Sequence, residues 1–169
     1  SNLLNEEVQP VGVMSFYNVK FSSYLSGFIP EDYIEDDLLR LNFYRRLNSI
    51  SSVSDIDDLK NEVVNRFGVS PLSFLLLLDE FTIRVISAKL YLSAIIIKKE
   101  FLVFEFDGGF WEPLVNKLFK FIESYVVLCG FEYNYINKSA GCSVKLLYKG
   151  GKLSYENVLD FLRSLGRII

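Results

Sequence analysis

The chain has no histidine, and its 169 residues include two cysteines, one methionine and one tryptophan. Histidine is the side chain that most often serves as a general base and as a metal ligand, so its absence disfavours both kinds of site. Cys129 and Cys142 are too few for a disulfide framework or a cysteine metal site. We expect both to be small buried apolar residues.

The sequence also lacks a basic excess and a long apolar run. Its 18 Lys and Arg stand against 21 Asp and Glu, for a net charge of −3. Proteins that hold DNA by its phosphates normally carry an excess of cations. The longest apolar run, 72–78, is interrupted by Ser73 and is far shorter than the roughly 20 residues that cross a bilayer. We recognise no signal-peptide pattern in the sequence, and we therefore expect a cytoplasmic protein without a membrane segment.

Sites for phosphate, metal or catalysis are not indicated either. Gly108-Gly109 and Gly150-Gly151 are isolated pairs without the spacing of a phosphate-binding loop, and they predict turns. The acidic residues gather where helices are expected to begin, which is where negative charge suits the helix dipole. We therefore expect no catalytic, cofactor-binding or metal-binding residue, and no enzyme activity in this chain. The acidic residues in question are Glu31, Asp32, Glu35, Asp36, Asp37, Asp55, Asp57 and Asp58.

What the chain does have is apolar surface: 50% of its residues are hydrophobic, with 15 Phe and 10 Tyr, enough to build a core. Residues 1–15 contain Pro10 and Gly12 and are predicted to connect to an upstream domain. Residues 16–169 are predicted to form one domain, which opens with an irregular strand over 16–28.

Apolar spacings of three and four then predict three consecutive helices. We expect Ser54 to cap the second helix and Gly68 to end it as a left-handed cap. We expect Ser70 to cap the third, with Pro71 in its first turn. The third is apolar nearly all round, which predicts a buried central helix. The helices are expected over 35–49, from Ser54 to Gly68, and from Ser70 to about Leu92.

The second half alternates strands and helices. Two strand pairs predict hairpins, a helix separates them, and a helix capped by Ser154 ends the chain. The order (β)-α-α-α-β-β-α-β-β-α predicts an α+β fold in which two antiparallel hairpins form a small sheet. The segments are 94–99 and 101–106 for the first hairpin, 111–128 for the helix, 131–135 and 142–148 for the second hairpin, and 155–165 for the last helix.

Three segments between residues 28 and 71 stand out as motifs. They are Phe28-Ile-Pro-Glu-Asp-Tyr-Ile, Arg40-Leu-Asn-Phe-Tyr-Arg-Arg-Leu and Leu59-Lys-Asn-Glu-Val-Val-Asn-Arg-Phe-Gly-Val-Ser-Pro. In this order and at these separations they resemble the C-terminal domain of the bacterial transcription-repair coupling factor. That family has an Ile-Pro-Asp-Asp-Tyr-Ile turn, an Arg-Leu-X-Phe-Tyr-Lys/Arg-Arg helix and a Glu-Leu-X-Asp-Arg-Phe-Gly-X-X-Pro helix end. Beyond Pro71 the resemblance is one of pattern alone.

The resemblance implies a regulatory role within a longer protein. The family's full-length protein is an ATP-driven DNA translocase that displaces stalled RNA polymerase and recruits the repair protein UvrA; its ATP and DNA are bound by upstream domains. Its C-terminal domain clamps onto a UvrB-like domain and masks the UvrA-binding surface. The matching clamp positions here are Glu62, Asn65 and Arg66, and Asn65 stands where the family has Asp.

Two other interpretations stay open at this stage. Glu62 and Arg66 lie four residues apart on a predicted helix and are compatible with an ordinary intrahelical ion pair. Arg40, Arg45 and Arg46 are compatible with phosphate contacts in a nucleic-acid-binding accessory domain. The acidic run that precedes these arginines and the lack of a broad basic face disfavour the second interpretation.

Overall fold

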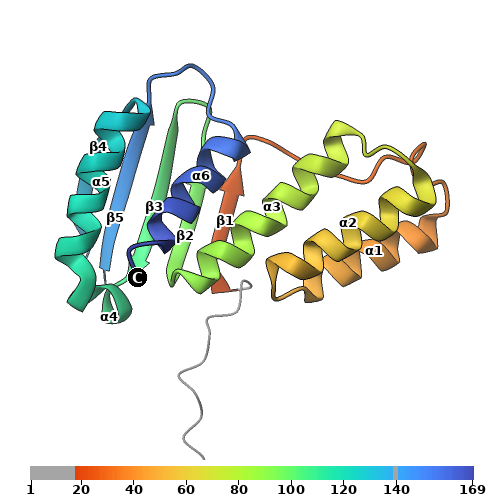
Figure 1. Cartoon of the computed structure of the whole chain (residues 1–169), viewed down its shortest axis with the longest axis horizontal. Helices are drawn as coiled ribbons and strands as arrows, with labels where there is room; N and C mark the ends of the chain where they lie inside the picture. The colour runs from red at the N-terminus through yellow and green to blue at the C-terminus, as the bar shows by residue number, and fades with distance from the viewer. Residues whose placement is uncertain (1–17, 139–140) are drawn as a thin grey trace, which may run out of the picture.

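The computed structural model describes residues 18–138 and 141–169, so the predicted connector 1–15 lies outside the described residues. The helices and strands follow the predicted α+β order, which confirms the fold class (Figure 1). They are β1 (Lys20–Ser23), α1 (Asp37–Ser49), α2 (Val53–Phe67), α3 (Leu72–Lys89), β2 (Leu92–Ile97), β3 (Phe101–Asp107), α4 (Gly108–Trp111), a 3-10 turn η2 (Glu112–Leu114), α5 (Val115–Cys129), β4 (Phe131–Lys138), β5 (Gly141–Tyr148) and α6 (Tyr155–Gly166).

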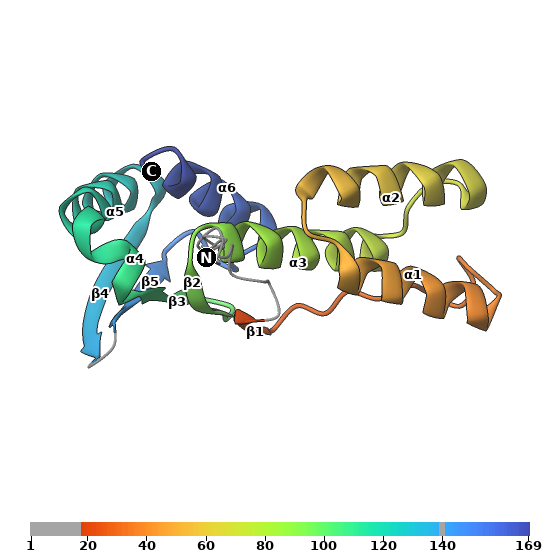
Figure 2. The same cartoon turned by 90° about the horizontal axis from the view of Figure 1, so that it is seen from below.

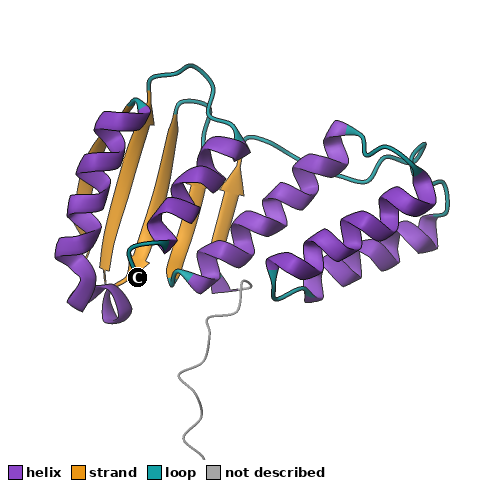
Figure 3. Ribbon diagram, viewed as in Figure 1, coloured by secondary structure: helices purple, strands orange, loops and turns teal. Residues whose placement is uncertain are grey.

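The described strands form one five-stranded sheet in the order β1-β2-β3-β5-β4 (Figure 3). The two predicted hairpins, β2–β3 and β4–β5, are both present and antiparallel, and β3 joins them by pairing antiparallel with β5. β1 pairs parallel with β2, from Lys20 opposite Ala94 to Ser23 opposite Ile97. The sheet is therefore mixed, an arrangement that the two predicted hairpins do not include. The reason is that three helices separate β1 from β2, and so long a connection permits a parallel partner.

The helices are arranged on one side of the sheet (Figure 2). α3, α5 and α6 cover one face, and within the described part of the chain no helix covers the other. α1 and α2 extend beyond the sheet and pack beside the N-terminal half of α3. We call α1, α2, the first half of α3 and residues 24–36 the helical lobe.

α3 belongs to both parts of the molecule, as its all-round apolar sequence predicts. It packs against α2 in the helical lobe and against β2 and α6 over the sheet. The segment before α1 crosses it at Gly27, where an added Cβ would lie 2.1 Å from the backbone nitrogen of Leu77. The next residue, Phe28, donates its backbone N–H to the carbonyl oxygen of Ser73 at 3.0 Å. The close approach explains why a residue without a side chain stands at position 27.

α6 closes the core over the sheet. Phe161, fully buried, stacks on Phe104 of β3 with ring centroids 4.8 Å apart and meets Tyr125 of α5 edge to face at 5.2 Å. Tyr125 donates its hydroxyl to Asp160 at 2.6 Å, which ties α5 to α6. The predicted cap at Ser154 is confirmed: its side chain and that of Asn157 form a reciprocal capping box.

Two of the predicted helix starts were wrong by one or two residues. Ser52, rather than Ser54, caps α2 by accepting the N–H of Asp55 at 3.2 Å; Val53 packs against the core, which moves the first turn two residues earlier. Ser70 does not cap α3. Pro71 is the N-cap residue, and its carbonyl oxygen accepts the N–H groups of Phe74 and Leu75. The hydroxyl of Ser70 is buried without a hydrogen-bond partner.

Helix ends also differ from the predictions. Gly68 does end α2 with a positive φ of 87°, but its ψ of −157° is not left-handed helical. α3 ends at Lys89 rather than near Leu92, because Leu92 begins β2. The predicted helix 111–128 is divided: α4 and η2 precede α5, and the 3-10 turn contains Pro113, whose missing N–H does not suit the interior of an α-helix.

The two cysteines are less buried than expected. Cys129 is exposed and Cys142 is half-buried, so the prediction of burial was wrong for Cys129. α5 buries Leu118, Ile122, Tyr125 and Val126. Cys129 lies in the last turn beside Val127 and Leu128, which are 85% and 83% exposed. This end of α5 extends past the core.

Candidate partner interface on the helical lobe

The first and third motif segments meet at Tyr33. Its hydroxyl donates to the carbonyl oxygen of Gly68 at 2.8 Å. Its ring lies 6.1 Å from that of Phe67 and 5.7 Å from that of Phe74, measured between centroids. The turn before α1 is thereby fixed to the loop between α2 and α3.

The second segment is joined to both of the others. Tyr44 of α1 accepts the backbone N–H of Ile29 at 2.8 Å. Phe43, fully buried, meets Phe67 of α2 edge to face at 6.3 Å. These aromatic residues of the motifs hold the helical lobe together, so their primary role is packing.

Arg40 fastens the turn that precedes α1. Its guanidinium donates to the carbonyl oxygens of Ile34 at 2.6 Å and Glu35 at 3.2 Å and pairs with the carboxylate of Asp37. The Arg40 side chain is only 13% exposed. An arginine held in this way has few donors left for a phosphate, which weakens the nucleic-acid interpretation for this residue.

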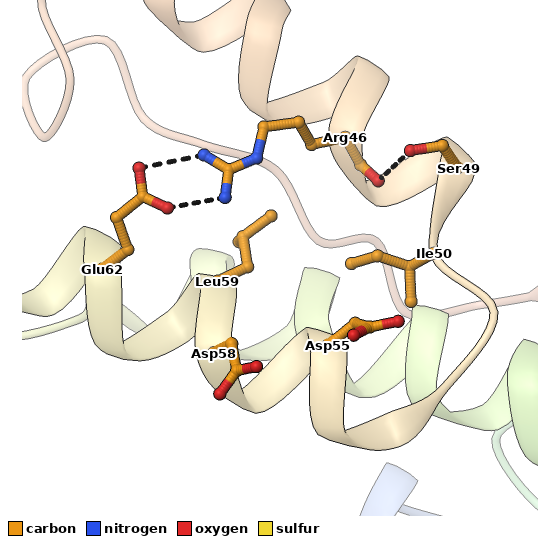
Figure 4. Close-up of a pocket in the computed structure, with 7 residues that line it drawn as sticks. All are labelled: Arg46, Ser49, Ile50, Asp55, Asp58, Leu59 and Glu62. Carbon is orange, nitrogen blue, oxygen red and sulfur yellow. Dashed lines mark hydrogen bonds and ion pairs between the residues drawn. The ribbon is translucent and has the colours of Figure 1, made fainter.

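Glu62 and Arg46 form a two-pronged ion pair between α2 and α1 (Figure 4). The guanidinium nitrogens of Arg46 donate to the two carboxylate oxygens of Glu62 at 2.9 and 2.6 Å. These hydrogen bonds, with the charges of Arg46 and Arg66, hold the pKa of Glu62 below the usual value of a glutamate. The same bonds raise the pKa of Arg46. Arg46 is therefore engaged within the lobe.

Arg66 is the weaker partner of Glu62. Its guanidinium lies 3.7 Å from the Glu62 carboxylate and 5.2 Å from the ring centroid of Phe67, and its side chain is 50% exposed. The predicted intrahelical pair thus exists, but the pairing with Arg46 dominates. Asn65 is exposed and lies about 200° around α2 from the buried Val63, so it points away from the core.

A groove of about 320 Å³ lies between the second half of α1 and the first half of α2 (Figure 4). The Arg46–Glu62 pair lies at one end and Asp55 at the other, with Asp58 at the outer rim, turned away from Arg46. Ile50 and Leu59 supply buried apolar side chains between the two helices. The groove is lined by Arg46, Ser49, Ile50, Asp55, Asp58, Leu59 and Glu62.

The structure brings two of the three predicted interface residues together and places the third beside them. Glu62 and Arg66 are paired, and Asn65 faces outward on the same end of α2. Sequence reasoning missed the pairing of Arg46 with Glu62 because the two residues are 16 positions apart on different helices. The sequence held part of the signal for this pairing. Phe43 and Leu47 lie on the buried face of α1, and Arg46 borders that face.

Neither a metal centre nor a membrane span is evident in the part of the chain that the structure describes. Its residues hold no group of three or more His, Cys, Asp or Glu side chains that could bind a metal ion. Of the helices in 18–138 and 141–169, none has both the length and the apolar character needed to cross a bilayer.

Comparison with known proteins identifies the class of domain. Residues 24–109 match the model of the TRCF domain. This stretch contains all three motif segments and the whole helical lobe, and it covers half of the chain. The chain belongs to this family, the C-terminal domain of transcription-repair coupling factors.

Individual relatives agree with this assignment. The transcription-repair-coupling factor of Rickettsia prowazekii is 31% identical over 101 residues, which is 60% of this chain. That of Escherichia coli is 33% identical over 66 residues, or 39% of this chain. A crystal structure of a C-terminal domain of transcription-repair coupling factor superimposes with a TM-score of 0.71 and 18% identity, covering 89% of this chain and 93% of that one. At this identity the superposition shows the fold.

The relatives are much longer proteins. The matched part spans 9% of the Rickettsia prowazekii protein and 6% of the Escherichia coli protein.

Proposed function

We propose that this chain is a non-catalytic regulatory domain of a transcription-repair coupling factor, acting in transcription-coupled excision repair. In its parent protein it docks on the UvrB-like domain and masks the surface that binds UvrA. It releases this surface when the motor engages a stalled RNA polymerase. ATP and DNA are bound by the parent's motor domains, and this domain requires no cofactor.

Family membership over residues 24–109 is the observation that carries the proposal. The three motif segments all fall in the helical lobe, and the positions that resemblance assigns to the clamp lie on its surface. Asn65 is exposed and the Arg66 side chain is 50% exposed, so both are accessible to a partner. Glu62 contributes indirectly, because its pairing with Arg46 and Arg66 fixes the guanidinium positions at this end of α2.

Nucleic-acid binding by the lobe is less well supported. Of the three arginines considered for phosphate contacts, Arg40 and Arg46 are engaged by carboxylates or carbonyl oxygens. Arg45 is exposed and lies on the side of α1 away from the buried Phe43 and Leu47. One exposed arginine on a chain of net charge −3 makes a poor electrostatic match to a polyanion.

The test uses the full-length parent protein with Arg66→Ala, which removes an outward cation from α2. We expect UvrA binding and basal ATPase activity to rise, because weakening the clamp shifts the population toward the open state. An interaction of about 1.4 kcal/mol changes that population ratio about tenfold. Folding should be nearly unaffected, since exposed substitutions usually stay within about 0.5 kcal/mol. UvrA binding that is unchanged would contradict the proposal.

Arg45→Ala is the matched control because it removes the same cation from the opposite side of the neighbouring helix. We expect no change in UvrA binding for this variant. If the lobe instead contacts DNA, Arg45→Ala lowers the DNA affinity and Arg66→Ala leaves UvrA binding unchanged.

Asn65→Asp tests the same interface in the opposite direction. Restoring the family's carboxylate should stabilise the closed state and lower UvrA binding.

A further inference from the structure

We propose that the outer edge of β4 pairs with the same edge of a second copy of this chain, so that two sheets join into one across a two-fold axis. The interface consists of the strand Phe131–Lys138 and of α5, which packs on it. The inference goes beyond the proposed function and does not depend on it. β4 and the helical lobe lie at opposite ends of the molecule (Figure 1), so self-association through β4 leaves the lobe free.

β4 is an edge strand that lacks the usual obstacles to pairing. Within residues 18–138 and 141–169, β5 is its only strand neighbour. It has eight residues, contains no proline and pairs with β5 without a register shift. The Glu132 carboxylate is paired with Lys149 of the same chain. Short length, proline, bulges and free charges are the devices by which natural proteins keep an edge from joining another strand. The outer edge of β4 is therefore open to a further strand.

The hydrogen bonds to β5 determine which backbone groups of β4 face outward. Lys149 donates its backbone N–H to the carbonyl oxygen of Gly130 at 2.9 Å, and the register beyond this bond is regular. Hydrogen-bonded positions alternate along an antiparallel ladder, so the N–H and C=O groups of Asn134 point to β5. Those of Tyr133 and Tyr135 point outward, where a further strand would pair with them.

Pairing about Asn134 makes this edge self-complementary. The two-fold axis places Asn134 opposite its own copy, and Tyr133 of each chain exchanges backbone hydrogen bonds with Tyr135 of the other. Both tyrosine side chains lie on the helix-covered face, with ring centroids 5.0 Å apart, and Tyr133 is 39% exposed. The pairing brings four tyrosine rings side by side, and aromatic cross-strand pairs of this kind stabilise antiparallel sheets.

A buried hydroxyl at the same edge also favours a second copy. The hydroxyl of Tyr135 is buried and has no hydrogen-bond partner among the described residues. Buried polar groups without a partner are rare in native structures and call for an explanation. In the proposed pair, the copy's Tyr133 stands directly opposite Tyr135 on the same face and brings a second hydroxyl beside it.

α5 adds charge complementarity to the strand edge. It packs on β4, where the ring of Phe119 meets that of Tyr135 at 4.6 Å between centroids. Glu123 is exposed and lies one turn after Phe119, on the same side of the helix. Lys117 and Lys120 are exposed nearer the N-terminus of α5. The two-fold axis sets the two α5 helices antiparallel, so the lysine half of each faces the glutamate half of the other. An interface between identical surfaces requires such self-complementarity.

The first experiment measures the association of the purified chain by sedimentation velocity over a range of concentrations. We expect a monomer–dimer equilibrium. Asn134→Lys places two like charges opposite each other at the axis and should raise the dimer dissociation constant about fivefold. Asn42→Lys is the matched control, because it adds the same charge at an exposed position of α1, and it should leave the constant unchanged. A chain that stays monomeric at NMR concentrations, or that dimerises equally well in both variants, overturns the proposal.

Oxidative cross-linking tests the register, in a chain whose exposed Cys129 is replaced by serine. In a non-hydrogen-bonded antiparallel pair the two Cα atoms lie about 4.5 Å apart, a separation that a disulfide spans. Asn134→Cys should therefore form a disulfide-linked dimer. Glu132→Cys should not, because position 132 and its copy are about 13 Å apart along the strands. Equal yields from the two variants would show random collision and overturn the proposed pairing.

Hydrogen exchange separates a second copy from any other occupant of the edge. The outward amides of Tyr133 and Tyr135 should exchange fast in dilute protein and slowly at high concentration. The amide of Asn134, which is bonded to β5, should exchange slowly in both. Outward amides that are slow at every concentration would mean that another part of the same chain covers the edge. Outward amides that stay fast while the chain dimerises would place the dimer interface elsewhere. Either result overturns the proposal.

Discussion

The hydroxyl of Tyr33 donates to the carbonyl oxygen of Gly68 at 2.8 Å, across 35 positions of sequence. One residue belongs to the turn before α1 and the other ends α2. The hydrogen bond shows that segments which look like separate motifs along the chain form one structural unit. Tyr33 is thus one of the motif residues that build the lobe, whereas Asn65 and Arg66 face outward.

Tyr44→Phe should destabilise the domain more than Tyr33→Phe. Removing the Tyr44 hydroxyl leaves the N–H of the buried Ile29 without its acceptor, at a cost of about 1–3 kcal/mol. Tyr33→Phe removes a more exposed bond, which is worth about 0.5–1.5 kcal/mol. Urea unfolding of both variants measures the difference, with Tyr133→Phe on β4 as a control. Equal destabilisation by the two substitutions would show that Ile29 finds another acceptor.

The pair of Glu62 and Arg46 should give a measurable pH dependence of small size. The hydrogen bonds from Arg46 lower the pKa of Glu62 in the folded protein. The stabilisation is therefore complete above the pKa of an unfolded glutamate, about 4.3, and is lost as the pH falls through the lower folded value. Because both side chains are more than a third exposed, we expect at most about 1 kcal/mol.

NMR titration of the Glu62 carboxyl carbon checks this expectation directly. In Arg46→Ala the Glu62 pKa should move up toward its ordinary value, whereas Arg45→Ala should leave it unchanged. A Glu62 pKa that does not respond to Arg46→Ala would mean that the two side chains do not pair in solution.

Phe161→Ala should cost about 3–5 kcal/mol, the usual range for removing a buried aromatic ring. Phe161 is fully buried between Phe104 and Tyr125, so no neighbour can fill its space without moving the sheet.

Deleting residues 154–169 removes α6 entirely, including the buried Leu162 and Leu165. Since whole domains are stable by about 5–15 kcal/mol, this deletion should abolish cooperative unfolding. A truncated chain that melts like the full chain would contradict the packing of α6.

Alkaline pH should destabilise the domain through its tyrosines. Burial, the hydrogen bond to Asp160 and nearby negative charge raise the pKa of Tyr125 well above its usual range. Burial raises the pKa of Tyr135 to about 12. Because these folded pKa values exceed the unfolded value of about 10, the stabilisation is complete below about pH 10 and is lost as the pH rises. Ultraviolet titration should show late ionisation of these tyrosines, and in Tyr125→Phe the ionisation at the highest pH should disappear.

Local sequence was enough to determine the order of helices and strands, the two hairpins and the ends of α1, α5 and α6 to within one residue. Apolar spacing predicted α1, α2 and α3, and alternation predicted β4 and β5, because these patterns arise from the geometry of single elements. Errors occurred where two local signals competed. Ser52 and Ser54 are equally good caps by chemistry, and only the packing of Val53 against the core chose the first.

The tertiary structure alone decided what the elements do to one another. No local pattern shows that β1 joins β2 in parallel, because that pairing depends on how three intervening helices return the chain to the sheet. The same holds for the site. The sequence placed Glu62, Asn65 and Arg66 on one helix, since spacing of three and four fixes a helix face. That Arg46 pairs with Glu62 follows from the antiparallel packing of α1 and α2, which brings together side chains that are distant along the chain.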